Sequence, residues 1–261
     1  MKSADNKTFI YEKTQIVETI CQLRFPSILS IEAKEPADFQ DTVRERFPRY
    51  SVREENLPAR EGGTQKTKNH SFISADGAWK LSLTKDFIAL STVRYPGWES
   101  FALTLDEVLG HFIQVYKPAF FERVGLRYLN GFSRRALELE GCRWNELLEP
   151  KYLGVLDDDS VKEDDVTKCS IDREQKLDER CALKLHAGPG SIRRTVRTDQ
   201  GMKTVQEPET RFILDLDIYS GGNTELAAVA ERLEALHGHA DRLFSDAITD
   251  RLHEAMCPVE L

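Results

Sequence analysis

The residues with the clearest chemical potential are two aspartates and a group of arginines. Asp215 and Asp217 lie in an apolar segment, so a strand would place both carboxylates on one face, about 7 Å apart. Such a pair can hold Mg²⁺ for phosphoryl transfer, because hard cations prefer oxygen ligands. The favoured alternative is pairing of both carboxylates with Arg123 and Arg127, because the sequence shows no phosphate-binding loop and no clear third ligand.

Four arginines are predicted to donate hydrogen bonds from the same surface as the two aspartates. They are Arg24, Arg94, Arg123 and Arg127. Guanidinium groups on central strands make directed, charge-assisted contacts with anionic groups. The mixed arginine and aspartate surface therefore indicates either an ordinary solvated sheet face or a binding surface for a protein or a small anion.

Two further motifs have ordinary structural interpretations. His237 and Asp241 share a helix face at a spacing that can chelate a metal, but no glutamate follows His237 as in zinc-protease helices, so exposed polar residues beside Gly238 are favoured. The segment 188–191 (Gly-Pro-Gly-Ser) indicates a hairpin turn rather than an anion nest. The sequence thus predicts no catalytic residue, metal ligand or cofactor.

The charge balance opposes binding of nucleic acid by long-range attraction. The formal net charge is −8, and the densest basic cluster comprises Arg193, Arg194 and Arg197. A protein that neutralises phosphates generally needs an excess of basic residues. Nucleic-acid binding through this cluster is therefore a second alternative and not the leading prediction.

Length and composition are those of an ordinary globular protein. The chain has 261 residues, of which 40% are hydrophobic, and no segment approaches the roughly 20 apolar residues that a membrane span needs. The first residues lack the apolar core of a secretory signal. The five cysteines are never spaced C-x-x-C, which favours reduced thiols and predicts a cytoplasmic protein.

The elements that must position these residues follow from hydrophobic periodicity. The first half predicts a strand over 14–25, a helix over 36–47, a polar loop over 54–70, a hairpin at Asp76-Gly77, a strand over 87–94 and a helix over 97–117. The second half predicts a strand over 120–130, a short helix over 144–153, strands near 166–171, 181–187, 191–198 and 211–219, and a helix over 223–256. That last helix would be about 50 Å long, enough to contact either the other lobe or a second subunit in a homodimer.

The two halves repeat one order of elements. Residues 22–25 (Gln-Leu-Arg-Phe) are echoed at 125–128 (Gly-Leu-Arg-Tyr), and residues 87–90 at 212–215. The sequence therefore predicts an α+β protein with a duplicated β-α-β-β-β-β-α unit, divided into lobes 1–118 and 119–261. That order is the topology of the TATA-box-binding protein, with helices on one face of an antiparallel sheet, although such a likeness carries no function.

Alternation along the strands predicts which side chains face away from the helices. On the last sheet strand these are Ile213, Asp215, Asp217 and Tyr219, and Thr92 and Arg94 are expected on the same face in the first lobe. The seam between the lobes is the second expected location of function.

Several phrases occur in the order found in one protein family. They are Leu23–Pro26, Phe39-Gln40, Phe47-Pro48-x-Tyr50, Trp79–Leu90, Tyr95-x-x-Trp98-x-x-Phe101 and Arg123–Asn130. Together they resemble the sporadically distributed bacterial and archaeal protein family of unknown function whose members have about this length. The resemblance covers roughly 14–256, implies no catalytic residues, and suggests a mobile-element or antiviral defence context.

The leading functional prediction is a non-enzymatic accessory or sensor protein. It would bind a protein partner or a small anionic ligand on the polar sheet face or at the seam, through Arg24, Arg94, Arg123 and Arg127, with Asp215 and Asp217 beside them. The first alternative is a metal-dependent nuclease or nucleotide-processing enzyme that uses Asp215 and Asp217. The second is the nucleic-acid-binding protein described above.

Overall fold

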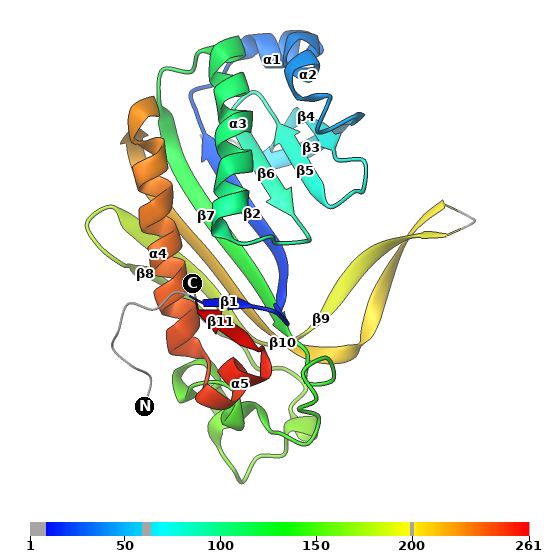
Figure 1. Ribbon diagram of the computed structural model, residues 1–261, viewed down its shortest axis with the longest axis vertical. Helices are drawn as coiled ribbons and strands as arrows, with labels where there is room; N and C mark the ends of the chain where they lie inside the picture. The colour runs from blue at the N-terminus through cyan, green and yellow to red at the C-terminus, as the bar shows by residue number, and fades with distance from the viewer. Residues whose placement is uncertain (1–8, 59–63, 199–200, 261) are drawn as a thin grey trace.

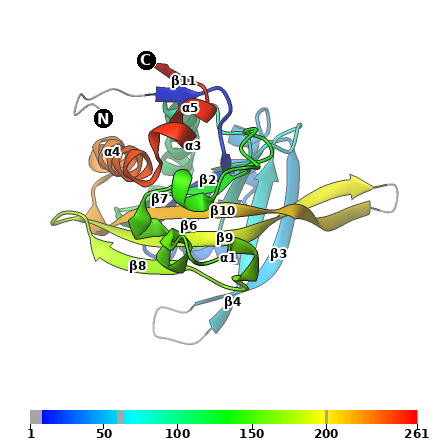
Figure 2. The same cartoon turned by 90° about the horizontal axis from the view of Figure 1, so that it is seen from below.

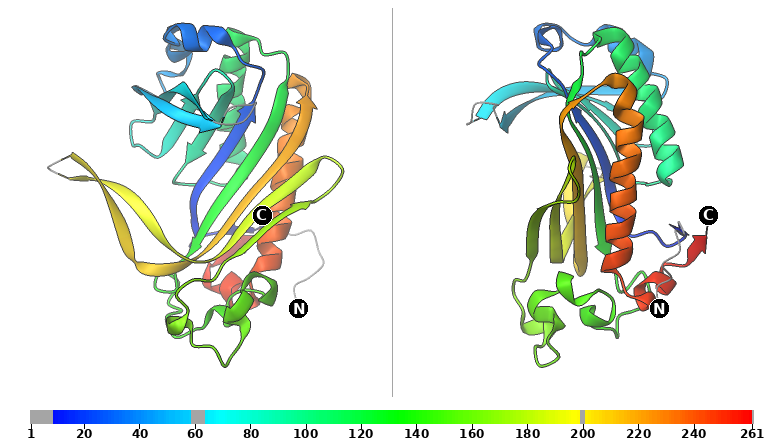
Figure 3. Two further views of the ribbon diagram at one scale, coloured as in Figure 1. Left: turned by 180° about the vertical axis from the view of Figure 1, so that it is seen from behind. Right: turned by 90° about the vertical axis from the view of Figure 1, so that its left-hand side faces the viewer.

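Alternation of apolar and polar residues along the strands gives most of them one buried side, and these sides are collected in a single sheet. The computed structural model describes residues 9–58, 64–198 and 201–260. Nine antiparallel strands are ordered β3-β4-β5-β6-β2-β7-β10-β9-β8. The two long helices, α3 and α4, cover one face of this sheet, as the right-hand view of Figure 3 shows. The predicted α+β class and the large antiparallel sheet are confirmed.

The elements of the first half end with the helix α3. They are β1 (Phe9–Tyr11), β2 (Ile16–Arg24), α1 (Leu29–Ala33), α2 (Ala37–Val43), β3 (Arg49–Pro58), β4 (Thr64–Ile73), β5 (Trp79–Leu83), β6 (Phe87–Thr92) and α3 (Trp98–Tyr116). Figure 1 shows this half as the blue to green part of the chain.

The second half begins with a strand and ends with two helices and a short strand. Its strands and helices are β7 (Phe121–Phe132), β8 (Ile171–Lys176), β9 (Cys181–Thr198), β10 (Gly201–Thr224), α4 (Val229–Ala247), α5 (Asp250–Ala255) and β11 (Pro258–Glu260). Short 3₁₀ turns lie at Trp144–Glu146, Pro150–Tyr152, Gly154–Asp157, Glu163–Asp165 and Leu226–Ala228.

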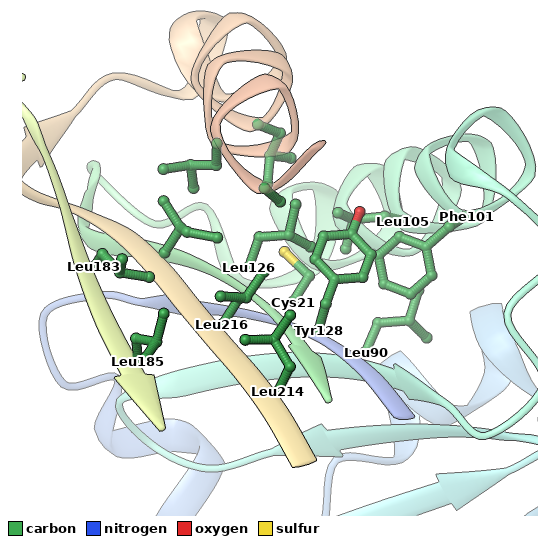
Figure 4. Packing of buried hydrophobic residues seen from close by; sticks show 14 of the residues in the cluster. Cys21, Leu90, Phe101, Leu105, Leu126, Tyr128, Leu183, Leu185, Leu214 and Leu216 are labelled. Carbon is green, nitrogen blue, oxygen red and sulfur yellow. The ribbon is translucent and has the colours of Figure 1, made fainter. Parts of the chain in front are cut away.

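The hydrophobic core lies between the sheet and the helices. Its central side chains come from β2, β7, β10 and α3, and Figure 4 shows Cys21, Leu126, Tyr128 and Leu216 packed against one another. The predicted turn at Asp76-Gly77 joins β4 to β5, and Gly77 has the positive φ of 73° that such a turn needs. The central strands, this hairpin and α3 therefore follow the sequence pattern closely.

The predicted polar loop over 54–70 is wrong at residues 54–58 and 64–70, and its middle, 59–63, lies outside the described residues. Residues 54–58 belong to β3 and residues 64–70 to β4, and the two strands pair from Arg49 with Ile73 to Pro58 with Thr64. Polar composition concealed these strands because some of their buried side chains are themselves polar. Thr67 and Asn69 are buried, and the Asn69 amide donates to Glu55.

The predicted break between strands 181–187 and 191–198 is also wrong. The Gly-Pro-Gly-Ser segment forms no hairpin turn and lies within the continuous strand β9, where Pro189 pairs with Phe212 of β10. Pairing with β8 on the other side ends at Ala187, so Pro189 occupies an edge that requires no N–H donor. Gly188 is needed because a Cβ there would overlap the carbonyl oxygen of Cys169.

Both predicted helices of the second half are shorter than expected. Residues 144–153 form two 3₁₀ turns in place of an α-helix. The last helix begins only at Val229, because β10 continues to Thr224, and it ends at Ala247, where Ile248 turns to an extended conformation. Nineteen residues give about 28 Å, not 50 Å, so reach toward a second subunit is no longer supported by length.

The strand register separates two residues that the second sequence echo had equated. Phe87 lies opposite Arg24, on the face away from the helices, whereas Phe212 is fully buried on the helix face. The echo of 87–90 at 212–215 is therefore wrong. Thr92 was expected on the polar face, but it is 1% exposed and lies opposite Thr19 on the helix face.

The two described ends of the chain meet beside α4. β1 pairs antiparallel with β11, from Phe9 with Glu260 to Tyr11 with Pro258. Figures 1 and 2 show this two-stranded ribbon on the helix side of the large sheet. The β9–β10 hairpin extends in the other direction, well beyond the sheet (Figure 3). Within the three described ranges, every helix is too short or too polar to span a lipid bilayer.

Candidate functional site

The predicted arginines and aspartates of the second lobe do meet on the polar face. Asp215 and Asp217 of β10 lie beside β7. Arg127 donates two hydrogen bonds to Asp215, from Nε to Oδ1 at 2.7 Å and from Nη2 to Oδ2 at 2.5 Å. Arg123 donates to both oxygens of Asp217 at 3.1 Å. We call these four residues the Arg/Asp ladder. Each carboxylate is thus matched by one guanidinium, and the hydrogen bonds that Arg127 donates to Asp215 raise the pKa of Arg127.

A missing side chain gives Arg123 its position. A Cβ at Gly125 would overlap the Arg123 guanidinium, which instead lies flat across that glycine. It also covers the ring of Tyr219, 4.5 Å from the centroid, before it reaches Asp217. Gly125, Tyr219 and Asp217 therefore hold Arg123 against the sheet, where its Nη2 group donates to both oxygens of Asp217.

One of the other predicted donors lies beside the ladder and one lies apart from it. Arg24 is exposed at the end of β2, directly opposite Arg123 of β7 on the same sheet face, and it donates to Gln22 at 3.2 Å. Arg94 follows β6 in a bend and pairs with Asp76 of the β4–β5 turn at 2.9 Å. Three of the four arginines therefore share the polar face, and Arg94 does not join them. Arg193 is exposed on β9, and the side chains of Arg194 and Arg197 lie outside the described residues.

The polar face carries a shallow cavity of about 390 Å³ next to the ladder. Among its described lining residues the cations are Arg127, Arg173 and Lys184, with His186, and the carboxylates are Asp172, Glu174, Asp215 and Asp217. Four carboxylates against three permanent cations do not favour a small anion. A metal between Asp215 and Asp217 would also have to displace both guanidinium groups, so the pairing favoured from sequence is the arrangement found.

A larger cavity, of about 830 Å³, lies on the helix side between elements of the first and second halves of the chain, and we call it the seam cavity. Its walls come from β1, the start of α3, β7, α4 and β11. Aromatic and polar side chains of its lining include Tyr11, Tyr95, Trp98, Glu99, Tyr128, Asn130, Glu234, His237, Asp241, Phe244 and Glu260, and Gly238 lies among them. A cleft of this size, with several aromatic side chains and a few converging polar groups, has the usual properties of a small-molecule site.

Four polar groups form a chain along the wall of the seam cavity. Tyr95 and Tyr128 bring their hydroxyls within 3.4 Å, and Tyr128 lies 3.0 Å from Nδ1 of His237. Nε2 of His237 lies 3.4 Å from an oxygen of Asp241. One tautomer satisfies the whole chain: Tyr95 donates to Tyr128, Tyr128 donates to Nδ1, and the Nε2 proton faces the carboxylate.

Burial shifts the proton equilibria of this chain. It lowers the pKa of His237 to about 4, and it raises the pKa of Asp241 to about 6, against which Arg242 acts. Burial also raises the pKa of Tyr128 well above its ordinary value. At neutral pH the imidazole and the phenols are therefore neutral, and Asp241 carries the charge of the chain.

Trp98 joins the two lobes at this site. Its ring stacks on His237 with 4.3 Å between centroids and 18° between planes. Its Nε1–H donates to Glu234 of α4 at 2.9 Å. Since Trp98 is the first residue of α3, these contacts fix the start of that helix against α4 and form one end of the cavity.

Another cluster has the composition of a metal site but is occupied by its own contacts. Ligand atoms of Asp178, Cys181 and His239 lie within 4.8 Å of one another. His239 contacts Asp178 through Nε2 at 2.8 Å and Arg242 through Nδ1 at 3.0 Å. Because Arg242 donates to Nδ1, the Nε2 atom carries the proton and is not free to bind a metal.

The sequence showed only part of the seam cavity. His237 and Asp241 were expected as exposed polar residues, but the His237 side chain is only 14% exposed. Trp98 and Tyr128 fall within the apolar patterns of a predicted helix and a predicted strand, which explain them without a cavity. The sequence offered one signal for this site: Trp98 stands at the first turn of one long helix, and the polar pair His237 and Asp241 lies in the other. A scan against protein-family models finds no match for the chain, and a search of curated proteins finds none.

Proposed function

We propose that the protein is a non-enzymatic accessory or sensor protein that binds a small molecule in the seam cavity. The observation that carries this proposal is the convergence of Trp98, Tyr128, His237 and Asp241 on one space of about 830 Å³. Residues from both lobes line it, so a ligand there would contact the two halves at once. Such a ligand could report its presence by changing how α3 and α4 pack.

The polar sheet face supports this function less well. Its arginines are engaged by Asp215 and Asp217, and releasing them would leave two carboxylates unpaired. A protein partner on this face remains a prediction, as do a homodimer and a cytoplasmic location. For the metal-dependent and nucleic-acid-binding alternatives, no contact among the described residues offers specific support.

We also propose that the lobes arose by duplication, as the sequence indicated. Strands β2 and β7 are central neighbours, and outward from them the order is β6-β5-β4-β3 on one side and β10-β9-β8 on the other. A long helix follows β6 and another follows β10. The first lobe has one strand more than the second, so the repeat is unequal. Membership of the sporadically distributed prokaryotic family, with its defence context, likewise remains a proposal.

A fragment screen by ligand-observed NMR tests the proposed function. Gly238 lines the seam cavity within α4, and a Cβ there has Arg242 at 3.6 Å as its nearest neighbour, so Gly238→Leu would fill the lumen without breaking the helix. The matched control is Gly110→Leu, at an exposed glycine of α3 with nothing near its Cβ. We expect fragments that bind the wild type and Gly110→Leu but not Gly238→Leu. Equal binding to all three proteins would contradict the proposal.

A further inference from the structure

The charged side chains that line the seam cavity are of one sign, and the nearest cation named above, Arg242, is not part of the lining. Four carboxylates line it, from Glu99 on α3, Glu234 and Asp241 on α4, and Glu260 on β11. None of the described lining residues is lysine or arginine. We call these four carboxylates the acidic rim. Because aromatic and aliphatic side chains form much of the wall beside them, their field is focused into the lumen. This potential attracts positive charge and repels anions.

The wall of the cavity is aromatic. Tyr95 and Tyr128 meet edge to face with 5.6 Å between centroids, as do Tyr11 and Phe244 at 5.6 Å. Trp98 adds an indole face. Aromatic rings carry negative potential on their faces, and organic cations bind there within about 6 Å of the centroid. The aromatic wall and the acidic rim thus favour the same kind of ligand.

One feature of the cavity acts in the opposite direction. The amide end of α3 opens onto it at Gly97 and Trp98, and a helix N-terminus attracts anions. Glu99 lies in the first turn of that helix and compensates this partial charge. The net field at the mouth therefore remains negative.

From the acidic rim and the aromatic wall together, we propose that the seam cavity selects an organic cation. The ligand would have a flat or chain-like apolar body, packed against Trp98 and Tyr128, and an ammonium or protonated heterocyclic nitrogen near Asp241. This inference rests on the proposed function, because it names the chemical class of ligand for the same cavity. It replaces the small anion that the sequence suggested.

Three probes of nearly equal shape test the charge preference. Phenethylamine is the cation, 2-phenylethanol is the neutral counterpart and 3-phenylpropionate is the anion. Isothermal titration of the full chain at pH 7.5 should give phenethylamine the highest affinity, about tenfold above the alcohol, with the carboxylate weakest. Raising the salt concentration should reduce the preference for the amine, since the rim carboxylates are exposed.

Variants separate this inference from the proposed function. Asp241→Asn should remove most of the tenfold preference while the alcohol still binds, and Glu231→Gln, an exposed charge on α4 outside the cavity, should change nothing. If the alcohol or the carboxylate binds as tightly as the amine, and Gly238→Leu abolishes that binding, the cation inference fails and the proposed function stands. If none of the three probes binds at millimolar concentration, both fail.

Discussion

Trp98 and His237 stack face to face with 4.3 Å between their ring centroids, although they belong to different halves of the chain. Trp98 begins α3 and His237 lies within α4, so the pair links the two helices directly above the central strands. The same two residues border the seam cavity, and each has a polar partner, Glu234 for Trp98 and Tyr128 for His237. A molecule that enters this cavity must contact the junction of the lobes.

Replacement of His237 should change how acid affects stability. The folded pKa of about 4 lies below the ordinary 6.5, so the contribution of neutral His237 is fully present above pH 6.5 and is lost as pH falls toward 4. Between pH 7.5 and 4.5, wild type should lose up to about 3 kcal/mol more unfolding free energy than His237→Gln. Urea denaturation at both pH values measures this.

Asp241 provides the control for that experiment, because its contribution has the opposite sign. Its raised pKa means that the neutral carboxyl is favoured in the folded state, so its contribution is present below about pH 3.8 and is lost as pH rises through 6. Asp241→Asn should therefore be more stable than wild type at pH 7.5 and not at pH 4. Parallel pH dependence of all three proteins would show that neither group is perturbed.

Binding of phenethylamine should weaken as Asp241 is protonated. The groups facing Asp241 are His237 and Arg242 on α4, Tyr11 on β1, Tyr95 before α3 and Tyr128 on β7. His237, the only other one among them near its titration range, remains neutral down to about pH 4. Affinity should fall up to about tenfold from pH 7 to pH 5, with no such fall in Asp241→Asn. Titration calorimetry at the two pH values decides this.

Gly125→Ala should destabilise the protein through Arg123. The added Cβ would overlap the guanidinium and push it away from Asp217 and Tyr219, which leaves a half-buried carboxylate without its partner. We expect a loss of about 1–2 kcal/mol. Gly110→Ala is the matched control, because position 110 is an exposed position of α3 where a Cβ meets nothing. This variant should gain about 0.5–1 kcal/mol of unfolding free energy. Urea denaturation that showed no difference between the two variants would argue against the described packing of Arg123.

The Arg/Asp ladder predicts that Mg²⁺ and Mn²⁺ leave the protein unchanged. Asp215 and Asp217 are each bound by an arginine, so a divalent cation would have to displace two charged groups. Thermal unfolding with millimolar Mg²⁺ or Mn²⁺ should match unfolding with the same ionic strength of NaCl. Metal-dependent cleavage of a nucleic acid, abolished by Asp215→Asn, would instead establish the enzymatic alternative.

The parts of the fold that followed from the sequence are those with a complete local signal. Helix α3 was expected over 97–117 and spans Trp98–Tyr116, because a full apolar stripe is bounded by Pro96-Gly97 and Pro118. The Asp215 and Asp217 face was also found as expected, since strand alternation fixes it. Both features follow from a short repeat, 3.6 residues in the helix and two in the strand, which a short stretch of sequence is enough to show.

The parts that did not follow depend on distant contacts. The end of α4 is set by Ile248, which bridges to Leu148, and by Thr249, which caps α5, while the periodic pattern itself continues to Met256. The continuity of β9 depends on Pro189 lying beyond the end of β8. The seam cavity could not be assembled from the sequence because its residues lie in many elements, from β1 to β11, and each residue has an adequate local explanation.

The indole N–H signals of the three tryptophans offer the most direct test of ligand binding at the seam. Trp98 lines the cavity. Trp144 is buried against Phe212 of β10, and neither Trp144 nor Trp79 belongs to the lining. In ¹⁵N-labelled protein, phenethylamine should shift the Trp98 Nε1–H signal and leave that of Trp144 in place. Saturable binding with an unmoved Trp98 signal would contradict the assignment of the seam cavity as the site.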